Sequence, residues 1–283
     1  MNVEIIEPYG FCVGVKRAIS TIERILKENP NEKIYCLGRL VHNQEVIDNL
    51  AKKGIIFLDG DKEKLIDSLE KGIVVFSAHG TSKKILKKAK NKRLKIVDAV
   101  CPFVSKEFEI IENKLQDDYQ IIYIGTNNHE EAKAALSLSN NIHFVTSIDD
   151  VNKLEINDQK IAVINQTTLS IINLKSIYQA IQEKYKNVVI IDEICNSTRI
   201  RQEKLISKSI IADGIIIVGD KTSNNSISLY NIALHNGYDA IMVSKYQEID
   251  LTWLNKKENI AILSGASTPN ETVNGIYKKL LSI

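Results

Sequence analysis

Three cysteines at equivalent points of an internal repeat constrain this 283-residue chain more than any other feature. Cys12, Cys101 and Cys195 lie 89 and 94 residues apart. Each follows a short apolar run typical of a strand and precedes a pattern typical of a helix. Polar loops recur about 28 to 30 and about 66 to 72 residues after each cysteine. We interpret this pattern as one α/β unit used three times.

Short runs rich in β-branched apolar residues alternate with amphipathic, helix-length stretches along the chain. The runs predict roughly twelve buried strands, near 2–6, 33–37, 55–58, 73–77, 94–97, 120–124, 142–145, 160–164, 187–191, 214–218, 239–243 and 260–263. Helices are expected between them, for example at 13–28, 81–90, 102–116, 170–185, 196–212, 226–236 and 270–281. Such alternation favours parallel sheets covered by helices.

The predicted fold class is therefore α/β, with three similar units of mostly parallel sheet arranged pseudo-threefold around a central cavity. The expected units are 13–97, 98–191, and 192–283 together with 1–12. The first strand is assigned to the third unit because the first two units each end on the strand before a cysteine. Functional loops of parallel sheets lie at the carboxyl ends of the strands. If the three units turn those ends inward, their polar loops surround one cavity.

Composition excludes several classes of protein. The 37 basic and 35 acidic residues are mixed along the chain and give a net charge of +2, which is no footprint of a nucleic-acid-binding protein. No apolar run approaches the 18 or so residues that a membrane span needs. The N-terminus opens directly into a strand-like run without a secretory signal pattern, so we expect a cytoplasmic protein.

The cysteines differ in the chemistry that they suggest. Cys36 lies inside an apolar strand and is expected to be part of the core. The other three follow strand ends in polar or glycine-containing turns, and at Cys12 and Cys101 the start of a helix follows, whose dipole favours a thiolate. Thiolates suit iron–sulfur clusters, zinc or copper(I), but the spacing matches no local zinc or ferredoxin pattern. Three thiolates cannot fill a four-iron cluster, and the iron left open is typical of a catalytic site.

The remaining loop residues suggest a site for an anion. Hydrogen-bond donors recur there, while a P-loop pattern is absent. The candidates are His42, His79, His129, Thr167, Ser223, Asn224, Asn225 and Ser267. Glu131 is the carboxylate suited to act as a general acid, because a desolvated carboxyl group is shifted toward its protonated form. Glu130 is expected to be an exposed first-turn residue, and His143 and His235 are expected to be structural.

Two other classes of function remain open from the residues alone. The same thiols and histidines could form a zinc-dependent hydrolase acting on a phosphorylated substrate, which would be colourless and oxygen-tolerant. Alternatively, the chain could be a non-catalytic phosphometabolite-binding protein, in which serine replacements of Cys12, Cys101 and Cys195 would leave ligand affinity intact.

Taken together, the motifs resemble the LytB or IspH family, the iron–sulfur 4-hydroxy-3-methylbut-2-enyl diphosphate reductases, over essentially the whole chain. The segments that carry the resemblance are Gly10–Val15, Leu40–Asn43, Ser77–Gly80, Asp98–Pro102, Asn128–Glu131, Gln166–Ser170, Ile194–Cys195, Ser223–Ser226 and Gly265–Ser267. The resemblance implies reductive removal of a hydroxyl group, giving isopentenyl and dimethylallyl diphosphates in the methylerythritol phosphate pathway.

The resemblance also implies a role for each candidate residue. Cys12, Cys101 and Cys195 would be the ligands of a [4Fe-4S] cluster with one open iron. The histidines with Ser223, Asn225 and Ser267 would bind the diphosphate, and Asn224 would serve mainly through its backbone. Thr167 and Glu131 would lie beside the substrate hydroxyl.

This chain departs from the family pattern at two positions and leaves its electron donor open. It has Glu130 where the family usually has proline, and Asn224 where the family usually has serine. No nicotinamide or flavin fingerprint is present, so a ferredoxin or flavodoxin type of donor is expected. The basic run 83–93 could dock such an acidic partner, although such runs are more often solvated helix faces.

Overall fold

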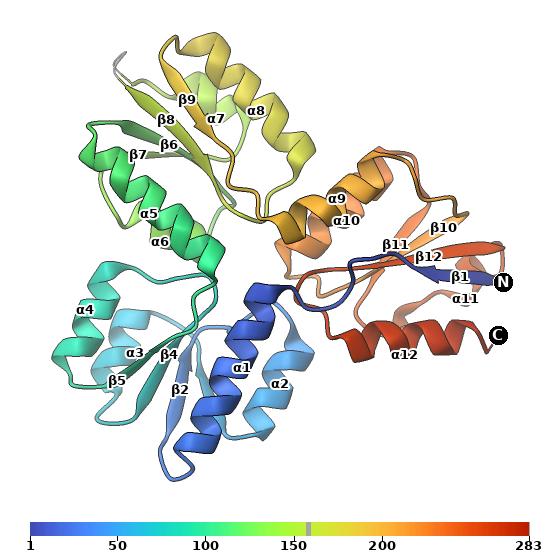
Figure 1. Ribbon diagram of the computed structural model, residues 1–283, viewed down its shortest axis with the longest axis horizontal. Helices are drawn as coiled ribbons and strands as arrows, with labels where there is room; N and C mark the ends of the chain where they lie inside the picture. Colours follow the sequence, from blue (N-terminus) through green and yellow to red (C-terminus); the bar gives the residue numbers. More distant parts are fainter. Residues whose placement is uncertain (157–159, 283) are drawn as a thin grey trace.

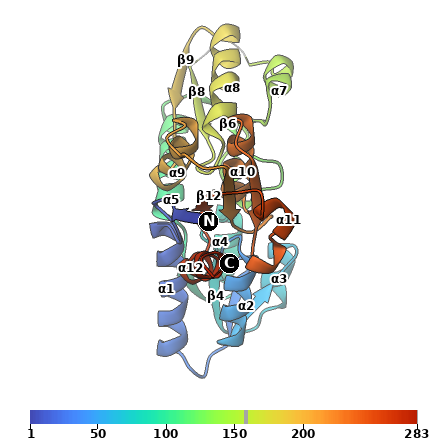
Figure 2. The same cartoon turned by 90° about the vertical axis from the view of Figure 1, so that its right-hand side faces the viewer.

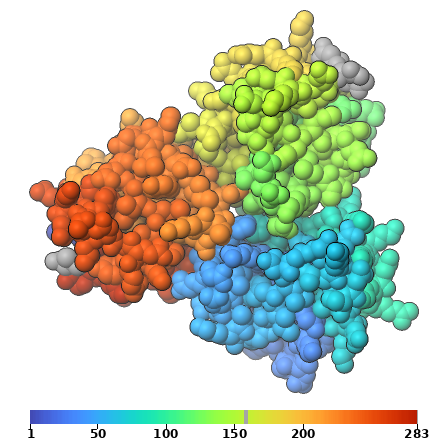
Figure 3. All heavy atoms as spheres, turned by 180° about the vertical axis from the view of Figure 1, so that it is seen from behind, coloured from blue at the N-terminus to red at the C-terminus, as the bar shows by residue number. Residues whose placement is uncertain are grey.

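The computed structural model describes residues 1–156 and 160–282. It contains three four-stranded sheets in which all neighbouring strands are parallel. If the strands of each sheet are numbered in chain order, all three sheets have the spatial order 2-1-3-4, with the first strand of the chain in the fourth place of the third sheet. Figure 1 shows three α/β lobes around a common centre, and Figure 3 shows the same three lobes from behind. The predicted fold class is confirmed.

The first unit is a sheet with helices on both faces. Its strands are β2 (Ile34–Leu37), β3 (Ile55–Leu58), β4 (Ile73–Phe76) and β5 (Lys95–Asp98), and its helices are α1 (Val13–Glu28), α2 (Gln44–Lys52), α3 (Lys62–Ser68) and α4 (Lys83–Asn91). Alternate strand residues point to opposite faces. Cys36 therefore packs toward α1 and α2, while Leu37 packs toward α3 and α4.

The second unit repeats this arrangement. Its strands are β6 (Gln120–Ile124), β7 (Ile142–Val145), β8 (Ile161–Asn165) and β9 (Val188–Ile191), and its helices are α5 (Pro102–Gln116), α6 (Glu130–Leu136), α7 (Ile148–Lys153) and α8 (Ile171–Lys184). Helices α5 and α6 pack on one face, and α7 and α8 pack on the other.

The third unit takes its last strand from the beginning of the chain. Its strands are β10 (Gly214–Val218), β11 (Ala240–Val243), β12 (Asn259–Ser264) and β1 (Asn2–Ile5). Its helices are α9 (Asn196–Ile206), α10 (Asn224–His235), the 3₁₀ turn η1 (Tyr246–Glu248), α11 (Leu251–Leu254) and α12 (Asn270–Leu280). Strand β1 pairs with β12, and the two chain ends lie close together in Figures 1 and 2.

The strands agree with the sequence prediction to within two residues at each end, whereas one helix is shorter than expected. Helix α9 ends at Ile206, although the pattern predicts a helix over 196–212. Lys208 has a φ of 52°, a left-handed conformation that stops the helix. Ile210 then packs into the core of the third unit.

The boundaries 13–97, 98–191, and 192–283 with 1–12 stay a prediction, and residues 157–159 and 283 within them lie outside the described part of the chain. Over the described ranges, no helix combines the length and apolar character needed to cross a membrane.

Candidate functional site

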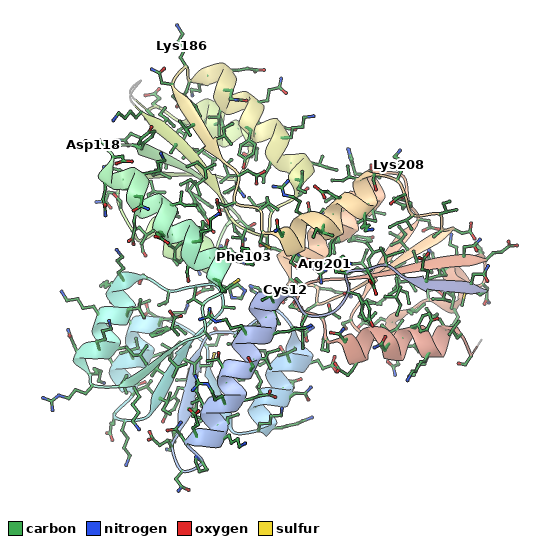
Figure 4. The ribbon with its side chains drawn as sticks, in the orientation of Figure 1. Cys12, Phe103, Asp118, Lys186, Arg201 and Lys208 are labelled. Atoms are coloured by element: carbon green, nitrogen blue, oxygen red, sulfur yellow. The ribbon has the colours of Figure 1, made fainter. Side chains whose placement is uncertain are left out.

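Each of the three cysteines caps a helix at the crossing from one unit to the next. Cys12 precedes α1, Cys101 precedes α5 and Cys195 precedes α9. The N-terminal ends of these helices meet at the centre of the molecule (Figure 1). Figure 4 labels Cys12 at this centre, whereas Asp118 and Lys186 lie at the outer end of the second unit.

All twelve candidate residues from the sequence line one cavity between the three units. They are Cys12, His42, His79, Cys101, His129, Glu131, Thr167, Cys195, Ser223, Asn224, Asn225 and Ser267. The parallel topology explains this convergence, because every one of these residues follows the carboxyl end of a strand. The described lining holds no lysine or arginine.

Burial governs the protonation of the thiols. It raises the pKa of Cys101 to about 11, and the nearby thiols of Cys12 and Cys195 add to that rise. Burial also raises the pKa of Cys195, although its Sγ lies 3.2 Å from the Thr198 hydroxyl. At Cys101 burial therefore opposes the effect expected of the helix dipole. Binding of a metal by protonated thiols releases protons.

The space beside the thiols fits the iron–sulfur cluster that the family resemblance implies. A Cβ at Gly14 would lie 2.5 Å from Cys101 Sγ and 3.9 Å from Cys12 Sγ, so glycine keeps the thiols accessible. Three convergent thiols are a donor set that iron–sulfur clusters use. Cys36, by contrast, is buried in β2, where burial raises its pKa to about 12. It belongs to the core, as expected.

Three histidines from two units form a cluster in the cavity. The ring centroids of His42 and His79 lie 4.5 Å apart, and His129 lies 5.3 Å and 5.4 Å from them. Burial lowers the pKa of all three, that of His129 to about 4. The cluster is therefore neutral at neutral pH, and the buried Nε2 of His42 has no hydrogen-bond partner among the described residues. An arriving anion would find a free donor here, because a neutral imidazole can carry its proton on either nitrogen.

Glu131 is held by Thr167 from the neighbouring strand end. The backbone N–H of Thr167 donates to one carboxyl oxygen at 2.6 Å, and its hydroxyl donates to the other at 3.1 Å. Burial raises the pKa of Glu131, although these two hydrogen bonds oppose the rise. Glu130 lies in the first turn of α6 as expected, but it is half-buried rather than exposed and forms ion pairs with Lys62 and Lys133.

The hydroxyl and amide residues connect the third unit to the other two. Ser267 Oγ donates to the backbone carbonyl of His42 at 2.9 Å. Asn224 Nδ2 donates to Thr126 Oγ1 at 3.1 Å, so the side chain of Asn224 also has a contact of its own. Helix α10 begins beside the cavity, and its first backbone N–H groups and positive dipole end favour an anion.

The N-terminal half of α10 also supports the thiol region. Asn225 Nδ2 donates to Thr198 Oγ1 at 2.8 Å, and Asn225 Oδ1 accepts the Ala266 N–H at 3.2 Å. Thr198 in turn contacts the Cys195 thiol. This chain of contacts fixes the position of one cysteine relative to the anion side of the cavity.

Sequence reasoning missed three buried polar residues near the cavity. Thr198 contacts the Cys195 thiol, Arg201 ties Gly10 to the end of β12, and Glu107 lies within α5. Glu107 could have been recognised from the sequence, because it is an acidic residue on the apolar helix face formed by Val104 and Ile111. Arg201 had no such signal, since Gly10 and Ser264, whose carbonyl groups it joins, are far away along the chain.

Docking of an acidic electron donor on the basic run 83–93 remains a prediction. Lys83, Lys84 and Lys88 form ion pairs with acidic residues of neighbouring helices. Outside the cavity, His143 contacts Gln120 at 2.9 Å and His235 ends α10.

Known proteins are similar to this chain over nearly its whole length. The model of the LytB protein family matches residues 3–281. A 4-hydroxy-3-methylbut-2-enyl diphosphate reductase of Geobacillus kaustophilus (strain HTA426) is 40% identical over 274 residues, which are 95% of this chain and 86% of that protein. A protein of the same name from Malacoplasma penetrans (strain HF-2) is 37% identical over 284 residues, covering 97% of this chain and 95% of its own.

Two solved structures share the fold. The E-1-hydroxy-2-methyl-but-2-enyl-4-diphosphate reductase from Plasmodium falciparum has a TM-score of 0.93 and 33% identity, covering 100% of this chain and 88% of that one. An (E)-4-hydroxy-3-methyl-but-2-enyl diphosphate reductase, described as the terminal enzyme of the non-mevalonate pathway, has a TM-score of 0.72 and 28% identity, covering 100% of both chains. The likeness thus extends from sequence to the arrangement of all three units.

Proposed function

This chain belongs to the LytB family, and from that membership we propose that it reductively removes the hydroxyl group of 4-hydroxy-3-methylbut-2-enyl diphosphate. The products would be isopentenyl and dimethylallyl diphosphates. The observation that best supports the proposal is the cavity itself, where thiols, imidazoles and a buried carboxyl group converge. These are the groups that an electron-transfer centre, an anion and a proton donor respectively require.

Cys12, Cys101 and Cys195 would hold a [4Fe-4S] cluster with one iron free of protein ligands. When bound, such a cluster supplies one-electron chemistry and a Lewis-acidic iron. The chain would contribute the shape of the thiol site, through Gly14, and would shield the reacting atoms from water. Electrons would come from a separate donor of the ferredoxin or flavodoxin type.

The diphosphate would lie against the histidine cluster and the start of α10. His42, His79 and His129 would donate hydrogen bonds, and Ser223, Asn224, Asn225 and Ser267 would complete the site from the third unit. Without a lysine or arginine in the described lining, the positive potential must come from helix N-termini and from protons taken up by the histidines. The allylic end of the substrate would then face Glu131 and Thr167.

The reaction needs two electrons and two protons for each substrate molecule. The carbon–oxygen bond breaks, the hydroxyl group leaves as water after accepting one proton, and a carbon–hydrogen bond forms with the other. Glu131 would deliver a proton, and the Thr167 hydroxyl would keep the carboxyl group and the substrate hydroxyl aligned. Protonation at either end of the allyl system gives the two products.

Anaerobic purification with iron and sulfide analysis, an absorption spectrum and a reductase assay tests the proposal. A brown protein with about four irons per chain is expected. Serine variants of Cys12, Cys101 and Cys195 should lose iron, whereas Cys36→Ala should keep it. A colourless protein that carries zinc and fails to reduce the substrate would contradict the proposal and favour a hydrolase.

A further inference from the structure

Glu107 is a buried carboxyl group that the reaction described above does not use. It lies on α5 between Val104 and Ile111, with an exposed fraction of 0%. Neither of its oxygens receives a hydrogen bond from a described N–H or O–H group. An ionised carboxylate in such a place is costly, since burial without a partner disfavours the charged form.

The groups that face Glu107 come from each element packed around it. The carboxyl group of Glu131 on α6 adjoins it, as does the hydroxyl of Tyr123 on β6, and Glu193 after β9 acts on it from further away. Tyr123 is itself fully buried, and Glu193 is paired with Lys106 at the surface. Two adjacent buried carboxyl groups cannot both be ionised at moderate cost, so the pair retains a proton.

The hydrogen bonds decide which member of the pair carries that proton at rest. Thr167 directs both its N–H and its hydroxyl at Glu131, and both bonds favour a carboxylate there. Glu107 has only the Tyr123 hydroxyl beside it, and although that group favours the carboxylate, burial together with the neighbouring Glu131 raises the pKa of Glu107 well above the usual range. These contacts favour a protonated Glu107 beside an ionised Glu131.

We propose that Glu107 is a positioning residue that supplies the proton which Glu131 passes to the substrate, an inference that rests on the proposed reductase function. In this step the O–H bond of Glu107 breaks as an O–H bond forms on Glu131, and Glu131 transfers a proton to the departing hydroxyl, which leaves as water. Both electrons come from the external one-electron donor. Glu107 is left as a carboxylate and takes up a new proton before the next turnover.

The test compares wild type, Glu107→Gln and Glu112→Gln under a chemical reductant such as reduced methyl viologen. A glutamine at position 107 can still donate a hydrogen bond to Glu131, but it cannot give up a proton. We expect kcat of Glu107→Gln to fall roughly tenfold or more, while KM for the diphosphate substrate stays unchanged. The decline of its activity toward alkaline pH should start at a lower pH than in wild type. Glu112 lies on the same helix at the surface and pairs with Lys83, so its variant should match wild type.

Infrared spectroscopy of the cluster-free proteins gives a second readout that does not need turnover. Wild type should show the carbonyl stretch of a buried protonated carboxyl group at neutral pH, and Glu107→Gln should lack it. A wild-type spectrum without that band, or a Glu107→Gln variant with unchanged kcat and pH profile, overturns the inference. If wild type itself fails to reduce the substrate, the proposed function fails, while the infrared result still decides where the proton lies.

Discussion

Thr167 donates to both carboxyl oxygens of Glu131, once through its backbone N–H at 2.6 Å and once through its hydroxyl at 3.1 Å. The two residues belong to different βα connections of the second unit, after β6 and after β8. The contact fixes the rotamer of a carboxyl group that faces the cavity. It therefore ties the proposed proton donor to the geometry of a sheet edge.

Replacing Glu131 by glutamine should lower turnover roughly 10²–10⁴-fold, because the amide keeps the shape but cannot give up a proton. Iron content and the absorption spectrum should match wild type, since Glu131 is not a thiol ligand. Steady-state kinetics with a chemical reductant measures the effect. Unchanged turnover would remove Glu131 from the proton path.

Replacing Thr167 by valine should have a smaller effect than Glu131→Gln. The backbone hydrogen bond survives, and only the hydroxyl bond is lost, which is worth roughly 1.5–3 kcal/mol when the acceptor is charged. We expect turnover to fall about 10- to 100-fold, since each 1.4 kcal/mol is a factor of ten. Thr167→Ser keeps the hydroxyl and is the matched control, and equal activity of the two variants would contradict the assigned role.

Replacing Gly14 by alanine should reduce iron incorporation. The new methyl group would lie 2.5 Å from Cys101 Sγ, well inside contact distance, so the thiol or α1 must shift. Gly275→Ala is the control, because a Cβ there meets nothing within 4 Å. Iron and sulfide analysis after anaerobic reconstitution separates the two variants. Full iron occupancy in Gly14→Ala would show that the thiols tolerate displacement.

Binding of a diphosphate should be accompanied by net proton uptake. Burial lowers the pKa of His42, His79 and His129, so these groups are neutral in the free protein at pH 7. A bound anion raises the pKa of each, and linkage requires that affinity then rises as the pH falls through the raised pKa values toward those of the free protein, where that of His129 is about 4. Calorimetry in two buffers with different ionisation enthalpies measures the uptake. The histidine assignment would be wrong if uptake were the same in His129→Asn as in wild type.

Replacing Arg201 by glutamine should lower the free energy of unfolding by at least about 2 kcal/mol, because buried carbonyl groups lose their donors. Arg201 donates to the carbonyls of Gly10 at 2.8 Å and Ser264 at 3.2 Å, and it is 3% exposed. Arg199→Gln is the control, since Arg199 forms only a partly exposed pair with Asp192, worth about 1 kcal/mol or less. Urea unfolding of the cluster-free proteins gives both values.

The strands and the convergence of the loops follow from local sequence. Runs such as Ile215–Val218 are apolar on both faces, which specifies a buried parallel strand, and parallel strands direct their following loops to one edge. That is why residues as distant as His42 and Ser267 could be expected in one cavity.

Features that depend on tertiary contacts could not be predicted in the same way. Arg201 joins two distant carbonyl groups, those of Gly10 and Ser264, and the pKa of Glu107 is raised by burial and by Glu131 across a helix interface. The burial that raises the pKa of Cys101 to about 11 is hidden for the same reason, because the sequence indicates the helix start but not the degree of burial. Desolvation and partner identity are properties of the assembled units.

The pairing of β1 with β12 also sets an order of events during synthesis. Among the strands in the described part of the chain, β1 is synthesised first and its partner β12 last. The first two sheets use only strands from within their own segments and can form as the chain lengthens. The third sheet cannot be completed until β12 has been synthesised, and Cys12 follows β1, the strand that then pairs with β12. Loading of the proposed cluster is therefore expected only after β12 has emerged and paired with β1.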